Sequence, residues 1–138
     1  MTKRMTTSGG TGRSRRGDPR LAVALARTCA ENRCRDVVVM DLRHLSPVTD
    51  FFVLATGTSD RQMRAAAGHA RDAAKAMGER PFGFEGADSG RWMLQDYVVA
   101  VLHLFNDESR RYYDLELLWG DAPRVNWQRG WKPRETET

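Results

Sequence analysis

The chain has 138 residues, of which 41% are hydrophobic and 29% charged, and this size and composition predict one soluble globular domain. It contains no run of the roughly 20 apolar residues that crossing a bilayer requires, and no apolar signal segment near its start. We therefore exclude a membrane protein and expect a soluble intracellular one.

The net charge of +4 is concentrated at the N-terminus. Residues 1–17 contain five basic side chains and no acid; taking these five charges from +4 leaves −1 for residues 18–138. The Gly, Ser, Thr and Arg composition of residues 1–17 predicts a disordered basic tail. Such a tail suits a weak, salt-sensitive contact with RNA, whereas the rest of the chain lacks the basic excess of a nucleic-acid-binding domain.

A first helix is predicted from Asp18, as N-cap, with Pro19 in the first turn, to about Arg33. Its apolar residues recur at spacings of three and four, as on one buried helix face. Cys29 and Cys34 lie near its end, without a second Cys or His pair. This spacing favours two reduced cysteines over a metal site or a disulfide.

Two buried strands are predicted next, over residues 36–42 and 50–56. The second strand ends in the turn "TGTS", where Ser59 and Gln62 match a capping box. The helix that follows is predicted to end near Met77, because Gly78 is a typical residue just beyond a helix.

A turn like "TGTS" between a strand and a helix can also hold phosphate on its free N–H groups. A phosphate-binding Walker loop needs more glycines and a lysine, and a nucleotidyltransferase needs two carboxylates on a neighbouring strand. Neither set of residues is present around Gly57. The pattern favours a capped turn, with no cofactor; the alternative is a divergent nucleotidyltransferase-like nucleotide-binding protein.

The second half of the chain predicts a short extended segment at 80–86, a turn at 87–90, and one long or two short strands over 91–105. A single helix capped by Asn106 or Asp107 should follow and end at Gly120. Four of its residues are predicted to share one face: Tyr112, Leu115, Leu118 and Trp119. Residues 122–138 show no clear element and either wrap back onto the domain or hang free. The order of elements predicts an α/β fold, a mixed β-sheet with packed helices.

Four carboxylates are candidates for acid–base chemistry: Asp50, Glu85, Asp88 and Asp96. Such chemistry requires carboxylates that converge on one cleft with shifted pKa values. Their positions at a strand start, in glycine-flanked loops and at a strand end favour structural or partner-facing roles. No catalytic residue is predicted.

Trp92 is the candidate centre of a protein-binding surface. Because alternate residues of a strand share a face, Trp92, Leu94 and Asp96 form an exposed strip if Met93 and Tyr97 face the core. An aromatic residue beside an aliphatic one and an acid is typical of a binding hot spot. The alternative is that Trp92 is simply a core residue.

Four segments in this order resemble the ribosomal silencing factor family, also called RsfS or Iojap-like: "TDFFVLATGTSDRQ", "PFGFEGADSGRWMLQD", "HLF" and "RRYYDLELLWGDA". The resemblance runs from about Arg20 to Ala122 and divides the chain into a tail (1–17), a silencing-factor domain (18–121) and a C-terminal tail (122–138). The residues at the family's motif positions are Asp50, Gly57, Ser59, Arg61, Gln62, Glu85, Gly86, Trp92, Asp96, His103, Tyr113, Leu115, Glu116, Leu118 and Trp119.

The resemblance implies a binding protein of the bacterial cytoplasm, not an enzyme, without cofactor or metal. Family members bind the large ribosomal subunit through its fourteenth protein and block subunit joining when nutrients are scarce. They are often homodimers when free, and their fold is nucleotidyltransferase-like without the catalytic carboxylates. The partner-binding residues would be Trp92, Asp96, Glu85 and Leu94, and the basic tail is suited to contact ribosomal RNA.

The chain departs from the family pattern after Asp96. Where the family shows Asp-x-Gly-Asp, this chain has Asp96-Tyr97-Val98-Val99. Valine, unlike glycine, does not readily adopt positive φ. We therefore expect a wider hairpin, or a continuous strand, and an altered presentation of Asp96.

Overall fold

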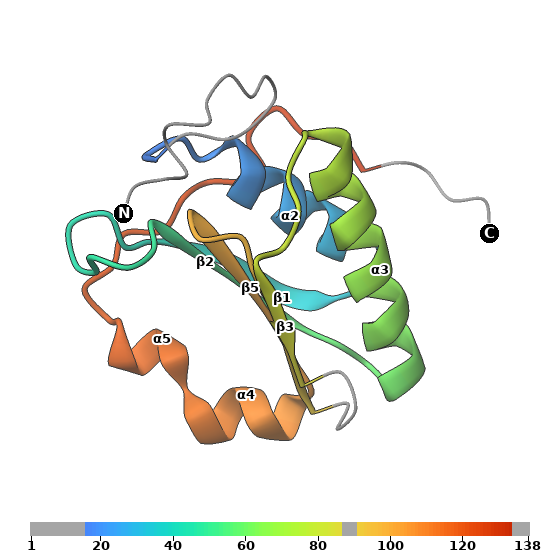
Figure 1. The fold of residues 1–138 in the computed structure, drawn as a ribbon. Helices are drawn as coiled ribbons and strands as arrows, with labels where there is room; N and C mark the ends of the chain where they lie inside the picture. Colours follow the sequence, from blue (N-terminus) through green and yellow to red (C-terminus); the bar gives the residue numbers. More distant parts are fainter. Residues whose placement is uncertain (1–15, 87–90, 134–138) are drawn as a thin grey trace.

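The computed structural model describes residues 16–86 and 91–133; the basic tail up to residue 15, the turn at 87–90 with Asp88, and residues 134–138 lie outside the described residues. A sheet separates two helical layers, with α2 and α3 on one face and α4 and α5 on the other (Figure 1). The helices are α2 (Arg20–Glu31), α3 (Asp60–Ala76), α4 (Asp107–Tyr113) and α5 (Leu115–Leu118). The strands are β1 (Arg35–Asp41), β2 (Phe51–Thr56), β3 (Gly83–Glu85), β4 (Trp92–Asp96) and β5 (Ala100–Phe105).

The sheet has the strand order β1-β2-β5-β4-β3. β2 and β5 pair in parallel at its centre, and the other neighbours pair antiparallel. The predicted mixed sheet with packed helices is therefore confirmed. Both central strands are almost wholly buried, as strands covered by helices on both faces should be.

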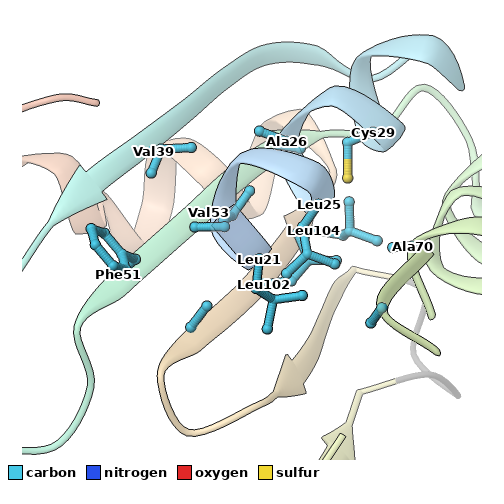
Figure 2. Close-up of a cluster of buried hydrophobic side chains, with 14 of the residues drawn as sticks. Leu21, Leu25, Ala26, Cys29, Val39, Phe51, Val53, Ala70, Leu102 and Leu104 are labelled. Atoms are coloured by element: carbon cyan, nitrogen blue, oxygen red, sulfur yellow. The ribbon is translucent and has the colours of Figure 1, made fainter. Parts of the chain in front are cut away.

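Strand alternation divides the buried side chains between two cores. The larger core lies under α2 and α3 and includes Leu21, Leu25, Phe51, Val53, Leu102 and Leu104 (Figure 2). The smaller core, under α4 and α5, contains Met40, Leu42, Leu54, Phe105 and Ala122, with Trp92, Leu115 and Trp119 partly buried against it. Residues at odd and even positions of β4 and β5 thus serve different layers.

The first two helices form close to their predicted positions, although the predicted N-cap Asp18 is wrong: α2 begins at Arg20, with Pro19 at the N-cap position, and Asp18 Oδ1 accepts from Arg20 N at 3.0 Å. The buried face of α2 is Leu21, Ala22, Leu25, Ala26 and Cys29, and both cysteines are buried free thiols. At the start of α3, Ser59 Oγ accepts from Gln62 N at 3.0 Å, while Gln62 Oε1 accepts from Thr58 N at 2.9 Å. Ser59 therefore caps the helix as predicted, while the return bond of Gln62 goes to Thr58 N and not to Ser59 N as in a standard capping box, and Gly78, at φ +82°, follows the helix as predicted.

The hairpin between β4 and β5 is tight, so the predicted wide hairpin or continuous strand is wrong. Tyr97 N donates to Ala100 O at 2.8 Å, and Val99 N donates to Tyr97 O at 2.8 Å, which closes a γ-turn around Val98. Val98 adopts φ +72°, and its N–H donates to Asp96 Oδ1 at 2.8 Å. The strand pairing and the Asp96 carboxylate together hold valine in a conformation that glycine normally occupies.

We predict that Val98→Gly stabilises the protein by about 1 kcal/mol. Positive φ costs a β-branched residue roughly 1–3 kcal/mol, and glycine removes this strain at the expense of a half-buried side chain and some chain entropy. Urea unfolding measures the change. The matched control is Val99→Gly, which removes a buried side chain at an ordinary φ and should cost about 2 kcal/mol. A loss of stability in Val98→Gly would contradict the prediction.

The predicted single helix over residues 107–119 is wrong, because the helix is interrupted at Asp114. This residue has φ +43°, ends α4 and caps α5 by accepting from Leu117 N. Leu115 and Trp119 then pack on the smaller core, whereas Tyr112 and Leu118 are 78% and 70% exposed. The expected common face is thereby divided into a packed part and an exposed part.

Of the two courses left open for the C-terminal segment, residues 122–133 take the first and wrap back onto the domain. Asp41 N donates to Pro123 O, and Val125 N donates to Val39 O, alongside β1. Trp127 is 8% exposed in the larger core, and its Nε1 donates to Val37 O at 3.0 Å. This segment covers the edge strand β1, which would otherwise expose unpaired backbone groups.

Candidate functional site

An open pocket of about 590 Å³ lies where the start of β4 meets α4. Its walls combine aromatic rings with charged and small residues: Glu85, Gly86, Arg91, Trp92, Leu94, Glu108, Ser109, Tyr112 and Tyr113. β3 and β4 supply one wall and α4 the other. A concave surface with aromatic rings and a few polar groups is typical of a binding site.

Trp92 is half-buried at the base of this pocket. Its ring centroid lies 4.4 Å from that of Tyr113 and 5.1 Å from that of Phe105. Its Nε1 donates to His103 Nδ1 at 3.1 Å. Trp92 therefore packs against the edge of the smaller core and also lines the pocket.

Strand alternation places Trp92, Leu94 and Asp96 on one face as predicted, with Met93 and Tyr97 buried on the α2 and α3 side, but the three residues are half-buried and not an exposed strip. Glu85 and Leu94 line the pocket with Trp92, and they are partners in the β3–β4 register. Asp96 lies on the same face but at the far end of β4, outside the lining residues. Its carboxylate accepts from Val98 N and so stabilises the hairpin between β4 and β5.

Sequence reasoning missed the wall that α4 provides, with Glu108, Tyr112 and Tyr113. The prediction of one continuous helix hid it, since α4 and α5 were treated as a single amphipathic element. The signal available was the pair of adjacent tyrosines, of which one could not face the core. Tyr112 is 78% exposed and packs edge-to-face on Tyr113 at 4.9 Å.

α4 is held in place at both ends. Asn106 Oδ1 accepts from Ser109 N at 2.8 Å, and Asn106 N donates to Arg91 O, beside β4. At the other end, Arg110 Nη1 donates to Thr56 Oγ1 at 2.9 Å, and its Nε donates to Glu116 at 3.0 Å. These bonds fix the tyrosines relative to Trp92, so the pocket wall is preformed.

Burial lowers the pKa of His103 to about 3 from its ordinary value of 6.5. The imidazole is 4% exposed, with the rings of Phe52, Trp92 and Phe105 against it. The neutral form can accept from Trp92, as observed, only if Nε2 carries the proton. His103 is therefore a neutral hydrogen-bond acceptor at neutral pH, not a general base.

We predict that His103 makes the folded state acid-sensitive. The unfolded chain binds a proton near pH 6.5 that the folded chain does not, so stability falls as pH falls from about 6.5 towards 3. Between about pH 6.5 and 5 the loss should be about 1–2 kcal/mol. His103→Leu should lose less stability than the wild type over that interval in urea unfolding, and an equal loss in the two proteins would contradict the prediction.

The remaining candidates for chemistry are engaged in the fold. The buried carboxylate of Asp50 pairs with Arg16 at 2.9 Å and accepts from Gly17 N at 2.6 Å. In the "TGTS" turn, Gly57 N donates to Phe105 O and Thr58 N donates to Gln62 Oε1, and in the helix that follows Gln62 N donates to Ser59 Oγ, so these three N–H groups are not open to phosphate. Across residues 16–86 and 91–133, no cluster of three or more His, Cys, Asp or Glu residues could hold a metal ion. None of the described helices is long and apolar enough to cross a membrane.

The fold and site define a class of small α/β binding proteins, with a preformed aromatic pocket on one face of the sheet. A sequence profile of the family described as "Ribosomal silencing factor during starvation" matches residues 16–138. The chain therefore belongs to the ribosomal silencing factor family, RsfS, as the sequence motifs predicted. The family is defined by silencing of ribosomes and is not an enzyme family.

Relatives of known name agree with this assignment. The ribosomal silencing factor RsfS of Bacillus subtilis is 40% identical over 98 residues, which cover 71% of this chain and 83% of the relative. The chloroplastic protein Iojap of Zea mays is 32% identical over 107 residues, 75% of this chain but 45% of that longer protein. A solved structure of a Chromobacterium violaceum protein superposes with a TM-score of 0.70 at 28% identity, covering 86% of this chain and 92% of the other.

Proposed function

We propose that this ribosomal silencing factor binds the large ribosomal subunit through its fourteenth protein and blocks joining of the small subunit. It would thereby repress translation when nutrients are limiting. The observation that carries the proposal is the half-buried Trp92 at the base of a preformed aromatic pocket. Half-buried aromatic residues in such surroundings supply most of the binding energy of many protein interfaces.

The chemistry of the pocket favours a basic protein surface as the partner. Glu85 and Glu108 lie among its aromatic lining residues, and Arg91 is the basic residue of the set. A lysine or arginine of the partner would gain both charge complementarity and contact with the aromatic faces. Ribosomal proteins carry such residues in excess because they bind RNA, which agrees with a ribosomal partner.

One relative's name supports the large subunit in particular. The mouse protein called "Mitochondrial assembly of ribosomal large subunit protein 1" is 32% identical over 92 residues, which cover 64% of this chain and 40% of that protein. The name describes that protein. For this chain, the large subunit as the binding partner is part of the proposal.

Co-sedimentation with purified ribosomal subunits tests the proposal. The protein should migrate with large subunits and not with small ones, and it should reduce the yield of joined ribosomes when small subunits are added. Glu85→Lys should weaken the association, whereas Glu31→Lys, a charge reversal on the opposite face of the sheet, should not. Absence of co-migration with large subunits at low salt would refute the proposal.

Three further expectations belong to the same proposal. The protein acts in the bacterial cytoplasm, forms a homodimer when free, and uses its basic N-terminal tail to contact ribosomal RNA. Deletion of residues 1–15 should then reduce the salt dependence of binding without abolishing it. Kinship with the nucleotidyltransferase fold also remains a prediction, and a saturable calorimetric signal with nucleotide and magnesium would favour the alternative of a nucleotide-binding protein.

A further inference from the structure

His103 is an unusual residue for its surroundings. It lies in β5 on the α4 and α5 side of the sheet, where the Phe52 ring meets it at 4.5 Å and the Phe105 ring stacks parallel to it at 5.9 Å. Its Nε2 is buried without a hydrogen-bond partner among the described residues. An unsatisfied buried polar group destabilises a protein, and an apolar side chain of similar size would avoid that cost. Stability alone therefore does not explain a histidine here.

The other ring nitrogen offers an explanation. His103 Nδ1 accepts from Trp92 Nε1 at 3.1 Å. This hydrogen bond connects a residue of the central strand β5 to the tryptophan that lines the pocket. In the β4–β5 register Leu94 is opposite His103 and Trp92 is opposite Phe105, so the two bonded residues are diagonal neighbours on one face. Rings at such diagonal positions are within contact distance.

This bond determines how the indole is presented. The ring contacts with Phe105 and Tyr113 are apolar and weakly directional. They would therefore permit two indole orientations, one with the Nε1 edge towards His103 and one with the opposite edge towards it. A hydrogen bond from Nε1 is directional, so it selects the orientation with the nitrogen edge towards β5. The opposite edge of the indole is then the one directed away from His103.

We propose that His103 is a positioning residue, which fixes the orientation of Trp92 for partner binding. The inference rests on the proposed function, in which Trp92 contacts the ribosomal partner. His103 itself is buried and is not expected to contact that partner. The acceptor persists over the physiological pH range, since burial keeps the imidazole neutral.

The hydrogen bond can be tested in the free protein by the indole ¹H–¹⁵N resonance of Trp92, which is assigned by its loss in Trp92→Phe. His103→Leu should shift this resonance and speed exchange of its proton, because the acceptor is lost. His103→Asn retains an oxygen near the position of Nδ1 and should preserve the resonance better. Phe52→Leu, which removes a ring from His103 but no acceptor, is the matched control. An unchanged Trp92 resonance in His103→Leu would overturn the inference.

The functional role is tested by a double-mutant cycle on binding to large ribosomal subunits. His103→Leu should weaken binding about five-fold, the size of one ordinary hydrogen bond. In the Trp92→Phe background, where no indole N–H remains, the same substitution should have no further effect. If it weakens binding equally in both backgrounds, His103 does not act through Trp92. His103→Phe, which keeps a ring but has no acceptor, allows the same comparison if the leucine variant does not fold.

The two measurements separate failure of the inference from failure of the proposed function. If the wild-type protein does not bind large subunits, the proposed function fails, and the positioning role fails with it, even when the Trp92 resonance reports the bond. If the wild type binds and the cycle is additive, the proposed function stands and only the role of His103 is refuted.

Discussion

Replacing Trp92 by alanine should weaken binding to the large ribosomal subunit by about 2–4 kcal/mol, the range for truncation of an aromatic hot spot. The substitution removes the base of the pocket and the donor that pairs with His103. It also removes contacts with Phe105 and Tyr113, so the free energy of unfolding should fall by about 2 kcal/mol. Binding should be measured by sedimentation at a temperature where thermal melting shows the variant to be folded.

Trp131→Ala is the matched control for this experiment. Trp131 is also a half-buried indole with a bonded Nε1, which donates to Glu31 at 3.2 Å, and it packs on Trp127 at 5.2 Å. It lies against the α2 side of the sheet, away from the pocket. The control should lose some stability and retain binding. Equal loss of binding in both variants would show that stability, not contact, governs the result.

Gly86→Ala should be the most disruptive small substitution in the site. Gly86 adopts φ +82°, and a Cβ at this position would lie 1.8 Å from the carbonyl oxygen of Trp92. That oxygen belongs to the backbone of β4 and cannot move aside without shifting the strand. Strain from positive φ alone costs about 1–3 kcal/mol, so with the collision we expect a loss of about 3 kcal/mol or more.

The consequence for binding follows from the place of Gly86 in the pocket wall. Relief of the collision requires β3 to move from β4, which displaces Glu85 from its position opposite Leu94. Urea unfolding and co-sedimentation should therefore both report the defect. Gly83→Ala, in the same short strand, is the control: no atom lies within 4 Å of its Cβ position and its φ is not positive, so it should be nearly neutral. Similar losses in the two variants would contradict the close approach at Gly86.

Two residues of β4, Trp92 and Asp96, have different roles in the structure. Trp92, at the start of β4, contributes to the pocket, whereas Asp96, at its end, holds the strained hairpin by accepting from Val98 N. Asp96 was predicted as a contact residue, and a contact with the ribosome remains a proposal for it. Substituting Asp96 would therefore mix loss of contact with loss of the turn, which makes Glu85 the better test of charge in the site.

Local patterns in the sequence determined much of the fold. The apolar stripe of α2, the N-cap bond of Ser59 with Gln62, and the alternation along β4 each depend on residues within one element. The alternation also placed Trp92, Leu94 and Asp96 on one face, but only the structure shows that Met93 and Tyr97 occupy the face under α2 and α3. The motif series identified the family.

Only the tertiary structure decided the features that depend on distant partners. Val98 adopts positive φ because the paired strands and Asp96 outweigh its own preference. α4 ends where Asp114 adopts φ +43° and caps α5, and Arg110 holds both short helices by bonding Thr56 and Glu116. Residues 122–133 dock because Trp127 reaches the larger core and bonds a carbonyl of β1. The bonds of Arg110 to Thr56 and of Trp127 to Val37 join residues far apart in the chain, so no local pattern records them. The pocket, whose walls come from β3, β4 and α4, exists only once those contacts are made.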